Sequence, residues 1–569
     1  MILSQKSKTN NMKKIKLLIT IAILGTFSIA SSAYVESYFE ITKNLDIFSS
    51  VYREINVGYV EETNPGKLVK AGIDAMLASL DPYTNYIPES DIEDYRFMTT
   101  HEYGGVGAMI GKRGEHVMIT EPYKDAPADK AGLKAGDIII EVDGESAEGK
   151  TTSQLSNMLR GQRGTTITVK VKREATNEVI ERTVTREKIK IDDVPYSGML
   201  REGVGYISLR GFTETASKDV RKAFEELREE GMEELILDLR GNGGGLLRES
   251  VNIVNFFVEK GENVVEVKGK VKEHYRMNKA LYEPLDKDIP LVVLIDEGSA
   301  SASEIVSGSL QDLDRAVVIG HNSFGKGLVQ NTTDLSYNSM LKMTIAKYYT
   351  PSGRCIQRID YGGARDEYGR AKKIPDSLLT EYKTRNSRIV KDGAGIMPDL
   401  IVDDEEYSGL LAILMNEHII FDFATRYYFD HDSIPEPEEF KLSDEEYRDF
   451  VDYTMTQDFE YKTESGETLK ELEEVMKEDD FWEDVKEEYM ALKQKLIRNK
   501  RDDLLKFKPE ISLMLENEIA GRYYYSTGRI RAFLNYDPEI EKAVEVLNNK
   551  STYDSVLNGT CAYCQLKKG

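Results

Sequence analysis

Apolar residues near the start of the chain recur with the spacing of a helix face. The first repeat, with steps of three or four positions, comprises Phe48, Val51, Tyr52 and Ile55. A second repeat of similar spacing runs from Leu68 to Leu80, and Asp81-Pro82 closes it. We therefore predict a helical N-terminal region over residues 34–100.

From residue 101 to residue 175 the apolar positions form short runs that are separated by turn residues. These runs predict strands at residues 117–119, 138–142 and 167–171, with short helices at 126–131 and 153–159. Asp143-Gly144, a frequent hairpin turn, follows the second strand. The stretch is therefore predicted to form a small domain of its own.

Between residues 186 and 402 apolar strands alternate with amphipathic helices, which is the pattern of an α/β fold. Strands are predicted at 204–209, 234–239, 290–295, 316–319 and 340–349, and helices at 217–230, 246–258 and 301–313. The strand from Leu291 to Ile295 is apolar at every position, as expected for a strand that helices cover on both faces.

Residues 403–569 are strongly acidic, and their pattern predicts a mostly helical C-terminal domain that contains the only tryptophan, Trp482. The whole chain has a formal net charge of −24. This excess of acid argues against nucleic acid or anionic lipid as a partner, because both require a basic surface. For the C-terminal domain, dimerisation, adaptor contact and a merely solvated helical domain remain open.

The N-terminal segment has the features of a secretory signal. Lys13, Lys14 and Lys16 accompany an apolar run that ends near Ile29, and small residues follow up to Ala33. The run is shorter than the roughly 20 residues that span a bilayer. We predict a signal over residues 1–33; an uncleaved anchor that tethers the protein to the membrane is the alternative. Either way the protein would act in the periplasm or at the outer face of the cytoplasmic membrane.

Three cysteines are too few for a disulfide framework. A zinc site at Cys561 and Cys564 would need two more ligands nearby, and none is in view in the sequence. A redox site would need a surrounding βαβ pattern, which is also missing. A frayed tail or a local disulfide is therefore the expected role of this pair, and no metal site is predicted.

Ser301 is the first candidate for chemistry. The stretch from Gly298 to Ile305 directly follows the apolar strand and opens a helix. A serine at a helix start lies near backbone N–H groups and the positive end of the helix dipole, which would stabilise an oxyanion. Helix capping is the alternative role for serines in this position.

A serine nucleophile needs a base, and Lys326 lies in a second motif, Ser323 to Gln330. The six histidines form no recognisable triad with an acid, although His321 lies close to Lys326 in the sequence. A lysine base must be neutral, so its pKa must fall well below about 10.4, which burial can achieve. The apolar cover would come from Phe324, Leu328 and Val329.

Two glycine-rich stretches are further candidates for chemistry. Gly320 to Lys326 matches the start of a phosphate-binding loop, but Gly327 stands where a hydroxyl should bind magnesium, and no helix pattern follows. Nucleotide binding is therefore disfavoured. Asp238 to Gly245 lies at a strand end before a helix, where its glycines could direct backbone N–H groups towards an oxyanion.

The stretch from Ala128 to Ile138, with its A-x-x-A-G-L-x-x-G-D pattern, resembles a PDZ domain. In such domains the loop that holds a peptide carboxylate corresponds to Gly104, Gly105, Val106 and Gly107. Together with the S-A-S-A-S-E-I and F-G-K-G-x-V-Q motifs, this domain makes most of the chain resemble the C-terminal processing peptidases, also called tail-specific proteases.

That resemblance implies an α/β multidomain protein, with a PDZ-like domain over 101–175 inserted before a peptidase core over 186–402 and with helical N- and C-terminal regions. It implies that Ser301 is the nucleophile, that Lys326, 25 positions on, is the base, and that Gln330 orients the lysine. Backbone N–H groups of Gly244 and Ala302 would form the oxyanion hole. No cofactor is implied.

The implied function is an exported serine endopeptidase whose PDZ domain selects protein or peptide substrates by their free C-terminal tails and whose dyad works through an acyl-enzyme. Two other functions stay open on the sequence alone. One is a non-catalytic PDZ-containing scaffold on a peptidase fold, which would have no reason to keep Lys326. The other is an esterase that uses the same dyad. A homo-oligomer is compatible with each of them.

Overall fold

The computed structural model describes residues 39–366, 369–403, 406–459, 464–479, 481–496 and 500–561. The predicted signal segment, residues 1–33, and Cys564 lie outside these ranges. The chain divides into two compact units, one made of the residues up to Pro88 with Thr332–Met343, the other of Glu89–Asn331 with the residues from Thr344 onward. Within the described ranges, no helix combines the length and the apolar character needed to cross a bilayer.

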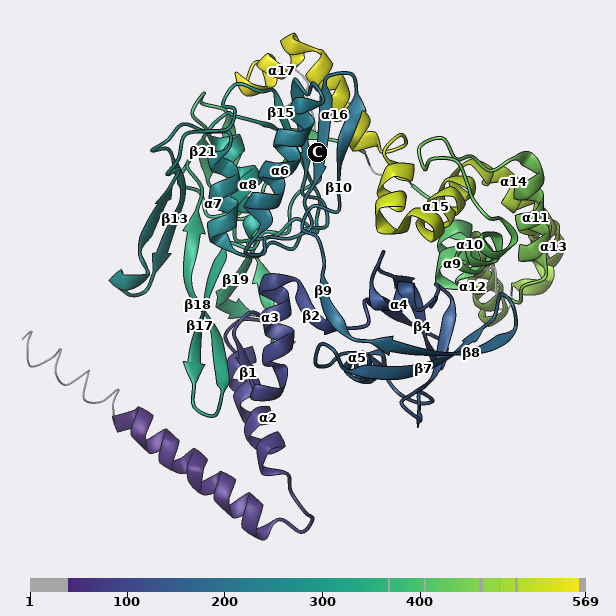
Figure 1. The fold of residues 1–569 in the computed structure, drawn as a ribbon, viewed down its shortest axis with the longest axis horizontal. Coiled ribbons are helices and arrows are strands. Elements are labelled where there is room, and N and C mark those ends of the chain that lie inside the picture. Colours follow the sequence, from purple (N-terminus) through teal and green to yellow (C-terminus); the bar gives the residue numbers. More distant parts are fainter. Residues whose placement is uncertain are drawn as a thin grey trace, which may run out of the picture. The chain divides into compact units, whose positions relative to one another are not determined.

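The smaller unit is mostly helical, as predicted. A helix covers residues 39–58, and α2 (Pro65–Ala78) follows it (Figure 1). The side chain of Asn64 caps α2, which therefore begins at the proline. The short strand β1 (Asn85–Ile87) pairs antiparallel with the first residues of β18 (Ser339–Tyr349).

The larger unit contains an antiparallel PDZ-like sheet with strand order β3-β4-β5-β7-β8 and with β6 beside β5. Its strands are β3 (Ala108–Arg113), β4 (His116–Pro122), β5 (Asp137–Val142), β6 (Glu145–Ser146), β7 (Thr166–Arg173) and β8 (Glu178–Thr185). Two helices, α4 (Pro127–Lys130) and α5 (Thr152–Leu159), accompany it. The predicted strands and helices are confirmed; β8 was missed because most of its side chains face solvent and only its pairing with β7 defines it.

A two-stranded ribbon marks where the chain enters and leaves the PDZ-like domain. Before the domain come η1 (Glu89–Asp91), α3 (Ile92–Thr100) and β2 (Glu102–Gly105). After it comes β9 (Glu187–Lys190), which pairs antiparallel with β2. The ribbon brings both connections of the domain to the same place, as expected for an inserted domain.

The region predicted as the peptidase core is built on a second sheet of six strands, β10-β11-β12-β15-β16-β23. Its strands are β10 (Tyr196–Arg201), β11 (Val204–Ser208), β12 (Glu234–Asp238), β15 (Leu291–Ile295), β16 (Val317–Gly320) and β23 (Leu400–Ile401). All neighbours from β11 onward are parallel, whereas β10 is antiparallel to β11. The carboxyl ends of β12, β15 and β16 therefore meet at one edge, where sites of α/β folds form.

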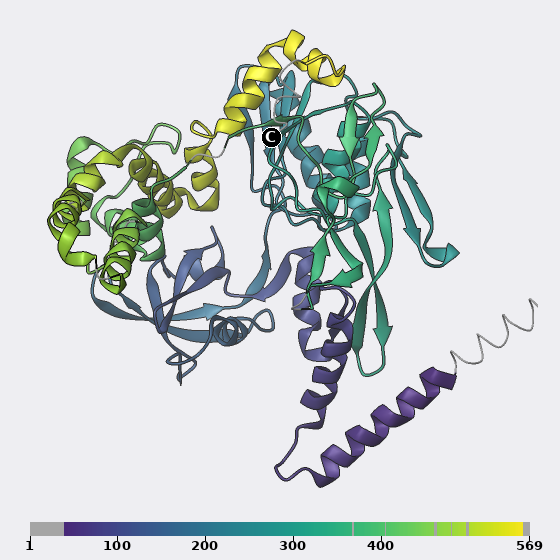
Figure 2. The same cartoon turned by 180° about the vertical axis from the view of Figure 1, so that it is seen from behind.

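Helices from distant parts of the sequence cover the two faces of this sheet (Figures 1 and 2). One face packs against α6 (Ala216–Glu229), α7 (Leu247–Asn255) and α8 (Ala302–Asp312). The other packs against α16 (Pro538–Asn548) and α17 (Lys550–Leu557), the last described helices. The C-terminal end of the chain thus completes the peptidase core, which the prediction of a single acidic domain after residue 402 did not foresee.

Further strands flank the core. β13 (Asn263–Gly269) pairs antiparallel with both β14 (Arg276–Lys279) and the end of β18, and β17 (Leu328–Leu335) pairs with β18. Short ribbons are formed by β19 (Ile359–Arg365) with β20 (Ala371–Lys373) and by β21 (Glu381–Lys383) with β22 (Ile389–Lys391). Two 3-10 turns, η2 (Lys272–His274) and η3 (Asp376–Leu378), lie between these strands.

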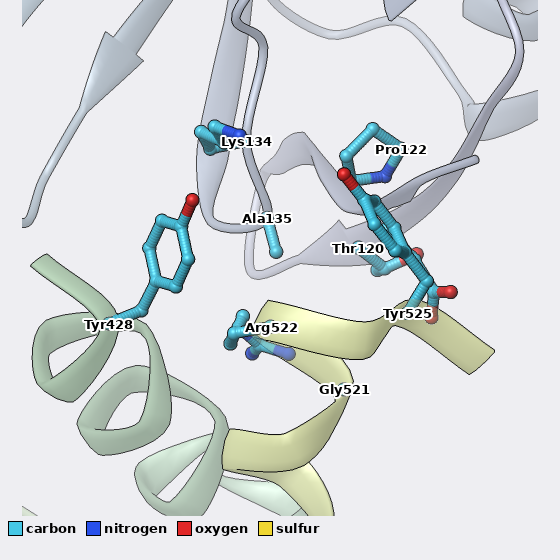
Figure 3. Close-up of a pocket in the computed structure, with 9 residues that line it drawn as sticks. Thr120, Pro122, Lys134, Ala135, Tyr428, Gly521, Arg522 and Tyr525 are labelled. Atoms are coloured by element: carbon cyan, nitrogen blue, oxygen red, sulfur yellow. The ribbon is translucent and has the colours of Figure 1, made fainter. Parts of the chain in front are cut away.

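The acidic C-terminal region is helical, as predicted, and has its own apolar core. Its helices are α9 (Gly409–Asn416), α10 (Ile419–Asp430), α11 (Asp444–Met455), α12 (Glu464–Glu478), α13 (Trp482–Leu496), α14 (Lys500–Lys506) and α15 (Lys508–Phe533). Helices α10 and α15 border a narrow pocket against the PDZ-like domain (Figure 3). Between the PDZ-like domain and these helices, the Tyr525 hydroxyl donates to Asp129 at 2.9 Å, and Arg113 pairs with Asp422 at 2.6 Å.

Candidate active site

Ser301 lies at the junction of β15 and α8. Its backbone has φ 55° and ψ −105°, a conformation that a non-glycine residue adopts only where its surroundings enforce it. The neighbouring serines are fully buried: Ser299 donates to the Leu239 carbonyl at 2.9 Å. Ser303 donates to the Asn242 carbonyl at 2.8 Å. The outer serines of the motif therefore anchor the turn, while Ser301 stays partly exposed.

One buried carboxylate, that of Glu304, binds both motifs that the sequence analysis identified. Its Oε2 accepts from the backbone N–H of Ser301 at 2.7 Å and from that of Lys326 at 2.9 Å. Its Oε1 accepts from the Ser323 hydroxyl at 2.5 Å and from the Gly325 N–H at 2.7 Å. The backbones of Ser301 and Lys326 therefore meet at the same oxygen atom.

The electrostatics of Glu304 follow from this position. The side chain is completely buried, and burial raises the pKa of its carboxyl above the ordinary value. The hydrogen bonds from Ser323 and from the backbone N–H groups lower that pKa and so oppose part of the rise. Because all four donors are neutral, hydrogen bonds rather than an ion pair hold this carboxylate in place.

The glycine-rich loop after β12 lies directly against Ser301. Gly244 has φ 97°, and a methyl group on its Cα would lie 2.6 Å from the Ala300 carbonyl oxygen and 2.9 Å from the Ala302 nitrogen. Only glycine fits such an approach. The N–H of Gly244 donates to Oδ1 of Asn242 at 2.9 Å. Ala302 is the first residue of α8, where backbone N–H groups have no acceptor within the helix.

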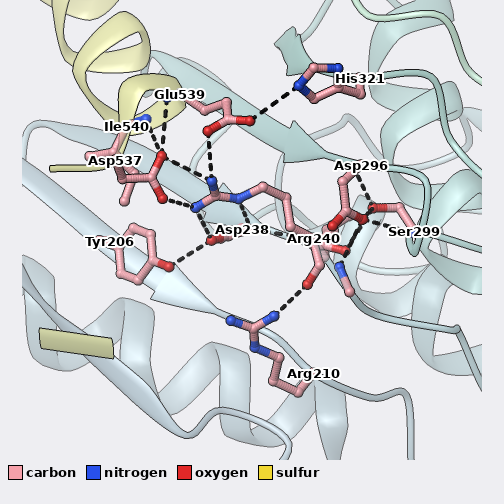
Figure 4. A network of polar contacts seen from close by, with 12 residues as sticks. Tyr206, Arg210, Asp238, Arg240, Asp296, Ser299, His321, Asp537, Glu539 and Ile540 are labelled. Carbon is pink, nitrogen blue, oxygen red and sulfur yellow. Dashed lines mark hydrogen bonds and ion pairs between the residues drawn. The ribbon is translucent and has the colours of Figure 1, made fainter. Parts of the chain in front are cut away.

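Arg240, in the same loop, lies at the centre of a cluster of carboxylates (Figure 4). Its guanidinium contacts Asp238 and Asp537, each at 2.7 Å, and Glu539 at 3.1 Å. Glu539 in turn lies 3.5 Å from Nε2 of His321. Asp537 is the N-cap of α16, so the cluster ties this C-terminal helix to the loop after β12. His321, which sequence proximity left open as a base, thus belongs to this cluster.

Arg240 and Asp238 shift each other's pKa. Burial, the largest single influence, would raise the pKa of Asp238, but Arg240, Arg210 and the Tyr206 hydroxyl together outweigh it and the pKa is lowered. Burial likewise opposes the charge of Arg240, whereas Asp238 and Asp537 raise its pKa well above the ordinary value. The Tyr206 hydroxyl also donates to Asp238 at 2.7 Å. The loop is therefore held by an ion-pair network in which one guanidinium joins three carboxylates.

Lys326 follows β16 in a tight turn, before β17. Gly325 has φ 88°, and a methyl group there would lie 2.5 Å from Cβ of Arg358, so the turn requires glycine. Gln330 lies on β17, where its side-chain amide donates to the Thr344 hydroxyl of β18 at 3.1 Å. The predicted apolar cover is corrected in one respect: Leu328 is buried, whereas Phe324 is 45% exposed because its side chain turns to solvent.

The predicted carboxylate-binding loop is only partly a loop. Gly104 and Gly105 belong to β2, because their backbone pairs with Lys188 and Glu187 of β9. The link from β2 to β3 consists of Val106, which is buried, and Gly107, which has φ 74°. Val106 packs into the core of the PDZ-like domain, whereas Gly104 and Gly105 belong to the ribbon that leads into it.

Sequence reasoning missed the roles of Glu304 and Arg240. The signal for Glu304 was available, since an acid three positions after a helix N-cap has the spacing of a capping box. No local sequence pattern predicts the contact between Arg240 and Asp537, because 297 positions separate the two residues.

Comparisons with known proteins agree with this architecture. The model of peptidase family S41 matches residues 203–366, a PDZ domain model matches residues 118–173, and the model "Probable PDZ-protease, C-terminal helical domain" matches residues 410–547. The three matched stretches lie on the core sheet, the PDZ-like sheet and the C-terminal helices, respectively.

A "Probable CtpA-like serine protease" of Staphylococcus aureus (strain MRSA252) is 32% identical over 429 residues, which cover 72% of this chain and 78% of that protein. One of Staphylococcus epidermidis (strain ATCC 12228) is 34% identical over 359 residues, covering 62% and 72%. The solved structure of a photosystem II D1 C-terminal processing protease is 28% identical, covers 63% of this chain and 92% of that one, and has a TM-score of 0.35. The chain is a PDZ-containing serine peptidase that belongs to peptidase family S41, together with the CtpA-like proteases.

Proposed function

We propose that this peptidase is an exported endopeptidase that recognises C-terminal tails through its PDZ domain and cleaves peptide bonds with Ser301 as nucleophile and Lys326 as general base. One observation carries the proposal: the N–H groups of Ser301 and Lys326 donate to the same oxygen of buried Glu304. A shared anchor of this kind fixes the separation of the two residues, and fixed geometry is what a nucleophile and its base require.

In the proposed cycle the neutral amine of Lys326 removes the proton of the Ser301 hydroxyl as the oxygen attacks the peptide carbonyl. The resulting ammonium returns that proton to the leaving amine, and an ester between Ser301 and the substrate remains. Water, deprotonated by Lys326, then hydrolyses this ester and restores the serine. Gln330, on the strand that follows the lysine, would orient the Lys326 side chain.

The N–H groups of Ala302 and Gly244 would stabilise the oxyanion of each tetrahedral intermediate. Ala302 supplies an N–H from the first turn of α8. The N–H of Gly244 donates to Asn242 in this structure, so it would turn towards the oxyanion during catalysis. Rotation of a peptide next to a glycine has little steric cost.

The PDZ domain would bind the substrate tail as an added strand and capture its carboxylate on backbone N–H groups near Gly107. Export, with residues 1–33 as a signal or an anchor, would place the reaction in the periplasm or at the outer face of the cytoplasmic membrane. Exported proteins with exposed C-terminal tails are then the substrate class.

The test is the cleavage of an unfolded test protein with an apolar C-terminal tail by the chain from Tyr34. Cleavage should be lost in Ser301→Ala and in Lys326→Ala, and it should weaken when the tail is amidated. Cleavage that persists in Ser301→Ala would overturn the assignment of Ser301 as the nucleophile. Hydrolysis of simple esters without peptide cleavage would favour the esterase alternative instead.

A further inference from the structure

The β13–β14 hairpin is a basic feature on an acidic protein. Residues 268–279 contain five cations and one carboxylate, whereas the whole chain has a formal net charge of −24. Four of the cations lie beyond ion-pair distance of every carboxylate in the described ranges; they are Lys270, Lys272, Arg276 and Lys279. All four side chains are exposed.

Apolar side chains share the end of the hairpin with these cations. Val271 is 44% exposed, Tyr275 is 53% exposed and Met277 is 38% exposed. Both views show the hairpin at the rim of the peptidase core (Figures 1 and 2). A basic surface with exposed apolar and tyrosine side chains matches the requirements of a membrane interface, where the cations meet lipid phosphates and the apolar groups enter the acyl boundary.

The hairpin is also preformed. β13 is hydrogen-bonded on both sides, to β14 and to β18. The Glu266 carboxylate accepts from the Tyr275 hydroxyl at 2.9 Å and from Lys268 at 2.7 Å, which links the two strands. A methyl group on Gly269 would lie 2.4 Å from Cβ of His274, so the turn between the strands packs tightly against the last residue of β13. Binding would therefore order few additional groups.

We infer that the end of the β13–β14 hairpin docks on an anionic phospholipid surface. The net negative charge of the chain does not prevent this, because at physiological salt a charge acts over about 8 Å and only the nearby cations meet the lipid. Repulsion between the anionic lipid and the acidic rest of the protein would instead orient the molecule so that the hairpin faces the membrane. Lipid is favoured over a soluble anionic polymer because charge alone would suffice for a polymer and would leave the exposed Val271 and Met277 without a role. The inference does not depend on the Ser301–Lys326 assignment.

The test is co-sedimentation of the chain from Tyr34 with phosphatidylcholine vesicles that contain or lack phosphatidylglycerol, at low and high salt. The wild-type chain should bind only the anionic vesicles, and high salt should release it. Each lysine near such a surface contributes about fivefold in affinity, so Lys270→Glu with Lys272→Glu should weaken binding by about 30-fold or more. The matched control, Lys218→Glu with Lys222→Glu on α6, makes the same change in charge and should bind as the wild type does.

A second pair of variants separates lipid from polymer. Val271→Ser should weaken vesicle binding several-fold and leave retention on a soluble polyanion unchanged. The inference is overturned if the hairpin and α6 variants bind alike, if vesicles without phosphatidylglycerol bind equally well, or if Val271→Ser has no effect on vesicles while the polyanion displaces the protein from them. Cleavage of a soluble test protein should be unchanged in all these variants, which shows that they are folded.

Discussion

The two loops of the candidate active site are each held by a buried carboxylate, but the two carboxylates are stabilised in opposite ways. Glu304 has four neutral donors, and its pKa is raised because burial dominates. Asp238 has Arg240 as a direct partner, and its pKa is lowered because Arg240, Arg210 and the Tyr206 hydroxyl together outweigh burial. Both side chains are buried to within 1% of their surface. The difference therefore comes from the partner, not from the depth of burial.

This contrast suggests that the Glu304 site and the Arg240 cluster have different roles. The Glu304 hydrogen bonds act on backbone atoms of the proposed nucleophile and of the lysine motif, so they set geometry where small shifts would change the rate. The Arg240 cluster joins the glycine-rich loop to α16 through ion pairs, so it mainly keeps two distant parts of the chain together. Loss of the Glu304 hydrogen bonds should reduce kcat more than stability, and loss of the Arg240 ion pairs should reduce stability more than kcat.

Removal of Arg240 should have the largest effect on stability. Arg240→Ala leaves buried Asp238 and Asp537 without their cation, which costs about 3–5 kcal/mol of unfolding free energy. Urea unfolding measures the loss. Arg240→Lys keeps the charge but not the forked geometry, so it should recover part of the stability. An Arg240→Ala variant as stable as the wild type would show that the cluster does not hold the core together.

Glu304→Gln should have the largest effect on rate relative to stability. The amide offers one acceptor oxygen in place of two and turns an N–H₂ group towards the remaining donors. This change should lower the unfolding free energy by about 1–3 kcal/mol. The resulting shift of Ser301 or Lys326 should lower kcat by about 10²-fold and change KM little.

The matched control is Glu249→Gln, which changes another buried carboxylate that accepts from a backbone N–H, that of Ser217, at 3.1 Å. This variant should lose comparable stability and keep its kcat. Equal kcat values for the two variants would contradict the role assigned to Glu304.

The two carboxylates should respond to pH in opposite directions. The pKa of Glu304 is raised in the folded state, so its contribution to stability is present below the unfolded pKa and is lost as pH rises through the folded one. The pKa of Asp238 is lowered, so its contribution is present above the unfolded pKa and is lost as pH falls through the folded one.

Urea unfolding at a series of pH values checks this for the wild type, Glu304→Gln and Asp238→Asn. Relative to the wild type, the Glu304 variant should improve as pH rises, and the Asp238 variant should improve as pH falls. Parallel pH profiles for all three proteins would refute the opposite signs.

Asp537→Asn should have the smallest effect. Asparagine still caps α16, and Arg240 keeps Asp238 and Glu539, so the loss should be about 1 kcal/mol. The weakened contact with Arg240 should let the glycine-rich loop move slightly, and kcat should then fall by at most about fivefold. Tyr553→Phe is the control, because it loosens α17 from Leu291 without touching the loop. A larger fall in kcat for Tyr553→Phe than for Asp537→Asn would show that the cluster does not position the loop.

The sequence predicted features whose signals are local. The core strands and helices followed from apolar patterns, and the candidates Ser301 and Lys326, which stay a prediction, came from motifs at two strand ends. The roles of Arg240 and Asp537 did not, because their contact joins residues 297 positions apart. Strands β8 and β14 were missed for a related reason: their exposed polar side chains carry little pattern, and pairing with β7 and β13 defines them.

The central claim is that Ser301 forms the acyl-enzyme, and its direct test is the mass of the covalent intermediate. The wild-type chain and Ser301→Ala would each be mixed with a peptide ester, quenched in acid and digested for mass spectrometry. The account predicts an acyl adduct on the peptide that contains Ser301 in the wild type and no adduct in the variant, and Lys326→Ala should form it far more slowly. An adduct on another residue, or turnover by Ser301→Ala, would contradict the account.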